Sequence, residues 1–273
     1  SGLTADDVKA ALDLCLSCKA CETECVSGVD MAKMKSEFVQ HIYDERGVPL
    51  RAWVFGHIAM LSALAAPVAP LANWALGLGR AKKLLGIAPE RTLPRFAPQT
   101  FDSWWRRRQA SGSRRPTADG RGTSDGRPSP SPVVLFVDTF ARYNHPQIAI
   151  AAVTVLERLG HAVIVPPWKC CGRPAISQGQ PKSMLSAAKH NIATLAPYAR
   201  QGMPILGLEP SCISALKDDY LDLLPGEAAR AVVCALGRIH AAGVLHLDLT
   251  LENVVVDVEA LRRGGAESQA ATV

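Results

Sequence analysis

The sequence lacks a secretory signal and the scattered cysteines of a disulfide-stabilised secreted domain. From Ser1 onward, no basic start leads into an apolar run and a small-residue cleavage site. Four of the eight cysteines fall within eleven positions, and two others are adjacent. Clustered thiols of this kind suit metal or redox chemistry in a reducing compartment better than disulfides. We therefore expect a cytoplasmic protein.

A broadly basic surface is also missing, although the formal net charge is +5. Residues 106–132 alone hold seven Arg against two Asp, and the rest of the chain is nearly balanced. This stretch is rich in Arg, Ser, Gly and Pro and has no apolar periodicity, so it cannot offset the entropy cost of ordering. We expect a disordered basic linker there, and no nucleic-acid partner.

From Gly56 to Gly79 the chain has no formally charged residue, and this length of chain can span a bilayer. However, Pro67, Pro70 and Asn73 lie near its middle, where a spanning helix would need its broken hydrogen bonds repaired. We predict two short helices that pack on a partner, with peripheral contact at the inner membrane as a further expectation.

The last forty residues change character, and part of them is similar to the catalytic loop of protein kinases. His246, Asp248 and Asn253 match that motif, but Leu247 stands where the motif has Arg. A glycine-rich loop, the strand lysine and the D-F-G element are not found in plausible places. We therefore reject a kinase and interpret residues 234–273 as an atypical tail, either foreign or the product of a frameshift.

The strongest motif is a run of four cysteines spaced C-x2-C-x2-C-x3-C, namely Cys15, Cys18, Cys21 and Cys25. In this spacing three thiolates bind one 4Fe-4S cluster, and the fourth binds a neighbouring cluster. Zinc sites more often use two separated pairs of ligands. We predict an iron–sulfur site in a loop between two helices. The second helix begins after Asp30, with apolar positions on one side at Met31, Met34, Phe38 and Ile42.

Two departures from this pattern keep an alternative open. Val26 follows Cys25, where the pattern has a proline that fixes the turn. No cysteine lies upstream of Cys15 to complete either cluster, so the chain is expected to be a fragment that lacks half of a two-cluster unit. The alternative is a truncated remnant that acts only as an α/β binding module, with its cysteines free or bound to zinc.

After the linker, hydrophobic runs alternate with helical periodicity and predict an α/β domain with a parallel sheet. Cys170, Cys171 and Cys212 each follow the end of a predicted strand. Ligands of open α/β sheets bind beyond the carboxyl ends of strands, so these thiols are candidates for a second cluster or a redox site. The alternatives are a transient disulfide, the lining of an interface, or buried apolar thiols. The predicted strands are 133–137, 162–165 and 204–208, and the predicted helices are 148–159, 184–198 and 213–224.

These motifs together resemble the iron–sulfur half of FAD-linked 2-hydroxyacid dehydrogenases. The resemblance runs through 15–21, 29–31, 134–140, 170–174 and 207–212, and it extends to the glycolate oxidase and anaerobic glycerol-3-phosphate dehydrogenase subunits. It implies an electron-transfer component that is not catalytic alone. Electrons would pass from a reduced flavin, held on a missing domain or partner subunit, to an acceptor such as a quinone or cytochrome.

The expected fold class is mixed α and β, with a helical ferredoxin-like half-domain followed by a cysteine-rich parallel α/β domain. The predicted divisions are a 4Fe-4S half-domain at 1–50, a helical connector at 51–105, the basic linker at 106–132, the cysteine-rich domain at 133–233 and the tail at 234–273.

Overall fold

The structure is a computed structural model that describes residues 5–112, 131–224, 226, 230 and 232. The chain divides into two compact units. Unit 1 comprises residues 1–93 and 172–187, and unit 2 comprises residues 94–171 and 188–273. The kinase-like stretch around His246 lies outside the described residues, as does most of the predicted linker.

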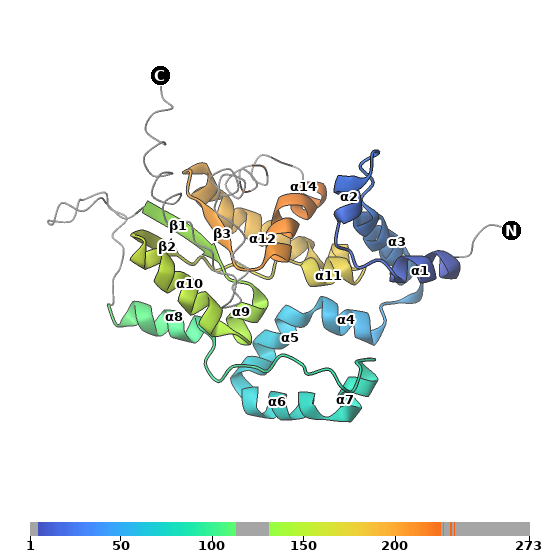
Figure 1. Cartoon of the computed structure of the whole chain (residues 1–273), viewed down its shortest axis with the longest axis horizontal. Helices are drawn as coiled ribbons and strands as arrows, with labels where there is room; N and C mark the ends of the chain where they lie inside the picture. The colour runs from blue at the N-terminus through green and yellow to red at the C-terminus, as the bar shows by residue number, and fades with distance from the viewer. Residues whose placement is uncertain (1–4, 113–130, 225, 227–229, 231, 233–273) are drawn as a thin grey trace, which may run out of the picture. The chain divides into compact units, whose positions relative to one another are not determined.

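Unit 1 is helical in its described part (Figure 1). Its longest complete helix, α3, begins as predicted at Asp30, whose carboxylate accepts a hydrogen bond from the Lys33 backbone N–H at 3.0 Å. It ends at Gly47, which has a φ of 84°. The helices are α1 (Ala5–Asp13), α2 (Ala20–Glu24), α3 (Met31–Arg46), α4 (Leu50–Gly56), α5 (Ile58–Ala65), the 3₁₀ turn η1 (Ala66–Val68), α6 (Ala69–Gly77), α7 (Gly79–Leu84) and α11 (Arg173–Ser177).

The buried face of α3 matches the predicted one only in part, since Ile42 is buried as predicted but Met34 is not. Met34 is 53% exposed, whereas Ala32, Ser36, Val39 and Ile42 are buried. The reason is that α11 approaches α3 closely on this side. Ser36 Oγ donates to the Ile176 carbonyl oxygen at 2.9 Å, and this contact requires small residues on α3. The cysteine loop is also less simple than predicted, since the short helix α2 lies inside it.

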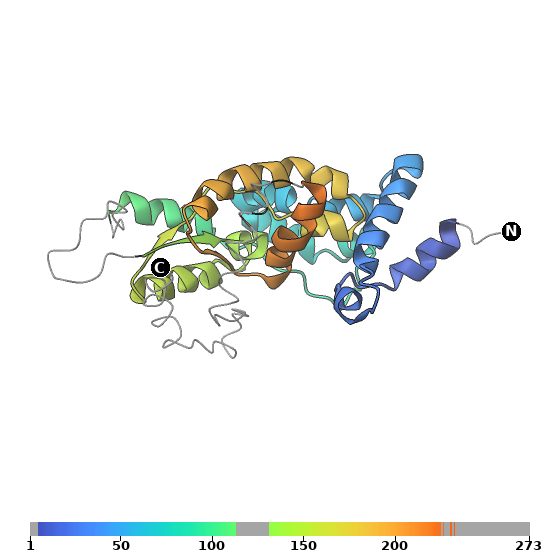
Figure 2. The same ribbon diagram turned by 90° about the horizontal axis from the view of Figure 1, so that it is seen from above.

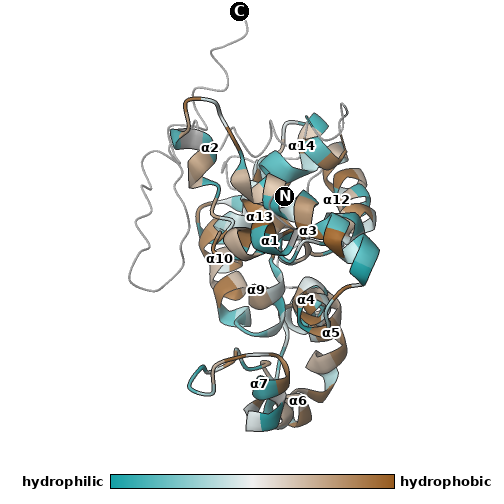
Figure 3. Cartoon of the chain, turned by 90° about the vertical axis from the view of Figure 1, so that its right-hand side faces the viewer, coloured by the Kyte–Doolittle hydropathy of each residue, from teal (hydrophilic) through white to brown (hydrophobic). Residues whose placement is uncertain are grey.

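The charge-free stretch forms α5, η1 and α6, so the two predicted short helices are found, with a 3₁₀ turn at Pro67 between them. By length and composition alone, Ile58–Gly77 is long and apolar enough to cross a membrane. Only 11% of its most apolar window is buried inside the structure, whereas a core helix of a soluble protein is mostly buried. Figure 3 shows the hydrophobic colouring of α5.

Unit 2 contains a parallel three-stranded sheet with the strand order β2-β1-β3. Ser131 of β1 pairs with His161 of β2, and Val134 pairs with Ile205 of β3. Figures 1 and 2 show α10 and α12 on opposite faces of this sheet. The expected mixed fold class is confirmed. The elements are α8 (Phe101–Ala110), β1 (Ser131–Phe136), α9 (Thr139–Tyr143), α10 (Pro146–Arg158), β2 (His161–Ile164), α12 (Pro181–Arg200, which begins in unit 1), β3 (Ile205–Gly207), α13 (Pro210–Ser214), the π-helical turn η2 (Ala215–Asp219) and α14 (Tyr220–Leu223).

The first five residues of the predicted linker, 106–110, are helical and belong to α8, so the predicted disorder is wrong there. Thr100 caps this helix by accepting a hydrogen bond from the Ser103 N–H at 3.2 Å. Phe101 is fully buried and stacks near Trp105. Two turns further along the helix, Arg108 forms an ion pair with Glu157 of α10. Packing against α10 therefore keeps residues 106–110 helical, although their composition is typical of an unstructured segment.

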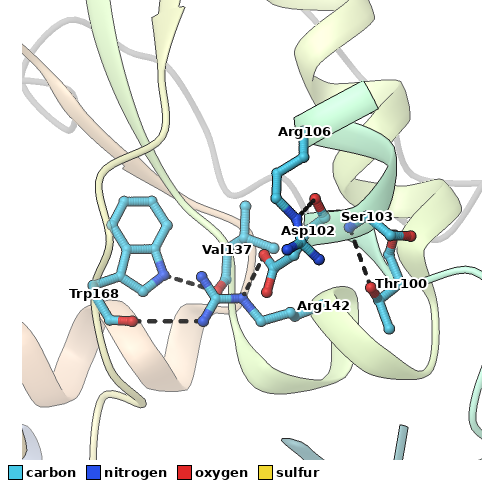
Figure 4. A network of polar contacts seen from close by, with 7 residues as sticks. All are labelled: Thr100, Asp102, Ser103, Arg106, Val137, Arg142 and Trp168. Carbon is cyan, nitrogen blue, oxygen red and sulfur yellow. Dashed lines mark hydrogen bonds and ion pairs between the residues drawn. The ribbon is translucent and has the colours of Figure 1, made fainter. Parts of the chain in front are cut away.

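A polar network joins α8, α9 and the segment that follows β2 (Figure 4). Arg142 Nε lies 3.1 Å from the Asp102 carboxylate, and its Nη1 donates to the Trp168 carbonyl oxygen at 3.5 Å. The Trp168 indole N–H in turn donates to the Val137 carbonyl oxygen at 3.2 Å. Because Trp168 is buried and lies two residues before Cys170, this network fixes the start of the cysteine-bearing loop.

Candidate cysteine sites

The four cysteines of the N-terminal run lie around α2 in unit 1. Cys15 follows α1, Cys18 lies in the connecting loop, Cys21 lies within α2, and Cys25 is the residue at which α2 ends. All four are free thiols. Cys18 and Cys25 are exposed, and the other two are half-buried. The run is therefore accessible from solvent at two of its four positions.

The loop backbone directs N–H groups toward sulfur at both ends of the run. The Ser17 N–H donates to Cys15 Sγ at 3.4 Å. Backbone N–H groups of Val29, Ser27 and Gly28 lower the pKa of Cys25 below its usual value. Hydrogen bonds to sulfur favour the thiolate, which is the form that binds metals. The donor set and its backbone support thus suit an iron–sulfur cluster chemically.

The structure does not gather these side chains into one coordination site. Among the residues that the structure describes, no three His, Cys, Asp or Glu side chains are placed to hold a metal ion together. The ligand set Cys15, Cys18, Cys21 and Cys25 therefore stays a prediction that depends on spacing and on the N–H···S contacts.

The second set of cysteines lies at the carboxyl edge of the sheet in unit 2. Cys170 and Cys171 follow β2, and Cys212 lies in α13, which follows β3. The Cys171 thiol donates to Cys212 Sγ at 3.0 Å, and both side chains are buried. Cys170 is only half-buried. The fold therefore brings together two thiols that are 41 residues apart in the sequence.

The topology explains why this edge of the sheet can form a site. With β1 in the centre, the connection to β2 leads to one side and the connection to β3 leads to the other. Open α/β sheets bind ligands beyond the carboxyl ends of the strands at the point where the connections diverge, which in this sheet lies between β1 and β3. Asp138 follows β1 there, and Glu209 and Cys212 follow β3.

Burial raises the pKa values of two groups at this edge, Cys212 and Asp138. A hydrogen bond from Cys171 lowers the pKa of Cys212, but burial and the charges of Asp138, Cys170 and Glu209 outweigh it, and the net change is upward. Burial likewise raises the pKa of Asp138, although Asp138 accepts hydrogen bonds from the Ala141 and Phe140 N–H groups at the start of α9. The thiol form of Cys212 is thus favoured over the thiolate at this edge.

Asn191 of α12 is the residue at this site that the sequence analysis missed. It is fully buried, and its Oδ1 accepts a hydrogen bond from the Lys169 N–H at 2.7 Å. Its Nδ2 donates to the carbonyl oxygens of Lys169 and Cys170 at 3.1 and 3.2 Å. The same Nδ2 lies 2.9 Å from the hydroxyl of Tyr220, which is also fully buried. The available signal was a single asparagine on the apolar face of a helix, between Ala188 and Leu195.

Gly172 closes the cysteine segment with a backbone conformation that suits glycine. Its φ is 85°, in the left-handed region. A Cβ at this position would lie 2.6 Å from Cε and 2.8 Å from Cβ of Met184. The close neighbour of Gly172 is therefore the Met184 side chain.

Comparison with known proteins places the second cysteine set inside a known domain family. The cysteine-rich domain family CCG matches residues 134–217. The chain is 29% identical over 188 residues to a subunit of the anaerobic glycerol-3-phosphate dehydrogenase of Escherichia coli K12, and the match covers 67% of this chain and 44% of that protein. It is 27% identical over 220 residues to D-2-hydroxyglutarate dehydrogenase of Pseudomonas putida, and this match covers 78% of this chain and 21% of that enzyme.

These matches confirm the predicted resemblance to the iron–sulfur part of FAD-linked dehydrogenases. The chain spans less than half the length of either relative. No solved structure gives a significant match.

Proposed function

We propose that this chain is the iron–sulfur, electron-transfer part of a flavin-linked dehydrogenase. Cys15, Cys18 and Cys21 would bind a 4Fe-4S cluster whose fourth ligand comes from outside this run, and Cys25 would serve a neighbouring cluster. The observation that carries the proposal is the spacing of the run, which the Ser17 N–H···Sγ bond to Cys15 supports. The relatives are dehydrogenases or a subunit of one, which agrees with a redox role.

The donor side of the reaction belongs to a flavin-binding domain or subunit. A reduced flavin releases two electrons and two protons on oxidation, and a cluster passes the electrons on singly to an acceptor such as a quinone or cytochrome. Relatives of the same region are named for glycerol-3-phosphate and for D-2-hydroxyglutarate, so this region does not select the substrate. A 2-hydroxy acid would be recognised by the flavin partner, in the cytoplasm.

Anaerobic reconstitution with iron and sulfide tests the cluster. We expect iron and acid-labile sulfide to bind, and an EPR signal to appear after reduction with dithionite. The Cys18→Ser variant should lose this signal, and Cys234→Ser, which changes a cysteine outside both sets, should keep it. If the wild-type chain binds zinc or no metal under these conditions, the electron-transfer role is wrong, and the chain is an α/β binding module without a cluster.

We also propose peripheral contact between unit 1 and an anionic membrane. Residues 47–89 contain no Asp or Glu, and their formal positive charges are Arg51, Arg80, Lys82 and Lys83. Within the same stretch, large apolar side chains are exposed, including Leu64 at 68%, Leu71 at 62% and Trp74 at 64%. Apolar side chains next to basic ones suit the interface between acyl chains and anionic headgroups.

Flotation with liposomes tests this contact. The protein should float with vesicles that contain an anionic lipid, and less so at high salt, because screening weakens the attraction of the basic residues. The double variant Leu64→Glu, Leu71→Glu should no longer float, while Val155→Glu, at an exposed apolar position of unit 2, should behave as wild type. Equal flotation of the double variant would refute the contact. Resistance to alkaline carbonate would indicate a spanning segment instead.

A further inference from the structure

Two basic side chains from outside the cysteine loop hold its backbone in unit 1. Lys35 of α3 donates from Nζ to the Cys15 carbonyl oxygen at 2.7 Å. Arg173, the first residue of α11, donates from Nη2 to the Ser17 carbonyl oxygen. Both bonds are charge-assisted, and such bonds are stronger than neutral ones. They attach the segment between the first two cysteines of the run to two different helices.

The held segment has a conformation that it would not favour alone. Ser17 has a φ of 55° and Lys19 has a φ of 63°, which are left-handed values that residues with a Cβ adopt infrequently. Ser17 is also buried, at 6% exposed. Because the Ser17 N–H···Sγ bond to Cys15 depends on this local backbone, contacts that fix Ser17 also fix a hydrogen-bond donor on the cysteine sulfur.

Arg173 is itself held by a rigid base. Its helix α11 is fixed to α3 by the hydrogen bond from Ser36 Oγ to the Ile176 carbonyl oxygen. Gly179, just beyond α11, has a φ of 71° and lies so close to Val39 that an added Cβ would be 2.3 Å from Val39 Cγ1. The guanidinium therefore approaches the loop from a part of unit 1 that cannot easily shift.

We propose that Arg173 and Lys35 are positioning residues of the N-terminal cysteine loop, which they preorganise for the cluster and supply with positive charge. This inference rests on the proposed iron–sulfur function. Net charge and hydrogen bonds to sulfur set the potential of an iron–sulfur cluster. Positive charge beside the loop favours the reduced cluster, which carries one more negative charge, and therefore raises the reduction potential.

Arg173 lies next to the second cysteine set in the sequence. Only Gly172 separates Arg173 from Cys171. The residue that holds the N-terminal cysteine loop therefore follows the second cysteine set almost directly in the sequence. The arginine of the Cys-Cys-Gly-Arg-Pro sequence thus has a role that the cysteines do not explain.

Two readouts test the proposal in the full chain. Without iron, hydrogen–deuterium exchange should be about tenfold or more faster at the amides of residues 16–18 in Arg173→Gln, because a charge-assisted bond is lost. In the reconstituted protein, EPR-monitored redox titration should give a more negative midpoint potential for Arg173→Gln and Lys35→Gln. Arg173→Lys keeps the charge, so it should recover most of the potential and less of the exchange protection.

Arg46→Gln is the matched control, since it removes one positive charge from an exposed ion pair with Asp6 in the same unit. If Arg173→Gln exchanges like Arg46→Gln at residues 16–18, the positioning role is refuted, whether or not the chain binds iron. If exchange accelerates in Arg173→Gln but its midpoint potential equals that of Arg46→Gln, the charge effect is refuted. Failure of the wild-type chain to bind iron contradicts the proposed function, and the exchange result still decides whether the loop is held.

Discussion

Replacement of Asn191 by alanine should destabilise unit 2 by about 2–4 kcal/mol. The largest part comes from the Tyr220 hydroxyl, which is fully buried and accepts its hydrogen bond from Asn191 at 2.9 Å. A buried polar group left without a partner costs about 1–3 kcal/mol. The three bonds to Lys169 and Cys170 add less, because Lys169 is exposed and water can replace the amide there. The net free energy lost with each hydrogen bond of this type is about 0.5–1.5 kcal/mol at most.

Urea unfolding of the full chain measures this effect, and a double-mutant cycle with Tyr220→Phe separates its parts. The single Tyr220→Phe change should cost only about 0.5–1.5 kcal/mol, because Asn191 keeps its bonds to the cysteine segment. In the double variant no hydroxyl is left unsatisfied, so the loss should be smaller than the sum of the single losses by about 1 kcal/mol or more.

A control and a local readout complete this test. Lys189→Ala changes an exposed residue of the same helix and should alter the free energy of unfolding little. Exchange at the Lys169 amide, which donates to Asn191 Oδ1, should accelerate in Asn191→Ala and not in Tyr220→Phe. A loss below about 1 kcal/mol for Asn191→Ala would show that Asn191 does not clamp the cysteine segment, and additive losses in the cycle would contradict its bond to Tyr220.

Two further changes test the fold around the sites. Gly172→Ala should lower stability by about 2 kcal/mol in thermal or urea unfolding, because alanine is strained by about 1–2 kcal/mol at positive φ and its Cβ meets Met184; an unchanged midpoint would contradict the backbone conformation. Burial lowers the pKa of His161 below 6.5, so the unfolded chain binds more protons, and stability should fall as the pH drops through about 6.5 and below. His161→Gln should show a weaker fall between pH 7.5 and 5.5, and equal slopes would refute this assignment.

Local signals in the sequence predicted most of the sheet and its connections. Runs of apolar β-branched residues marked β1 and β2 to within two residues at each end, and Asp30 marked the start of α3. Both signals are properties of a few adjacent residues. The placement of Cys171 and Cys212 at strand ends also followed from local signals, because parallel strands end at the same edge of a sheet.

What the sequence could not show depends on residues far apart in the chain. The buried face of α3 is set by α11, some 140 residues later, so Met34 was placed on the wrong side. Residues 106–110 are basic and look unstructured, but packing with α10 keeps them helical. Arg173 was noted only as part of a motif, because nothing local indicates that its side chain reaches Ser17.

The two cysteine sets differ in how the chain holds them, and this difference bears on assembly. Cys171 and Cys212 are buried and in contact at the edge of the sheet, so any ligand there must enter during folding or after α13 opens. The N-terminal run keeps Cys18 and Cys25 exposed on a loop whose backbone is already held by Lys35 and Arg173. If this run binds a cluster as proposed, we expect delivery after the chain has folded, because two of its four thiols are already exposed.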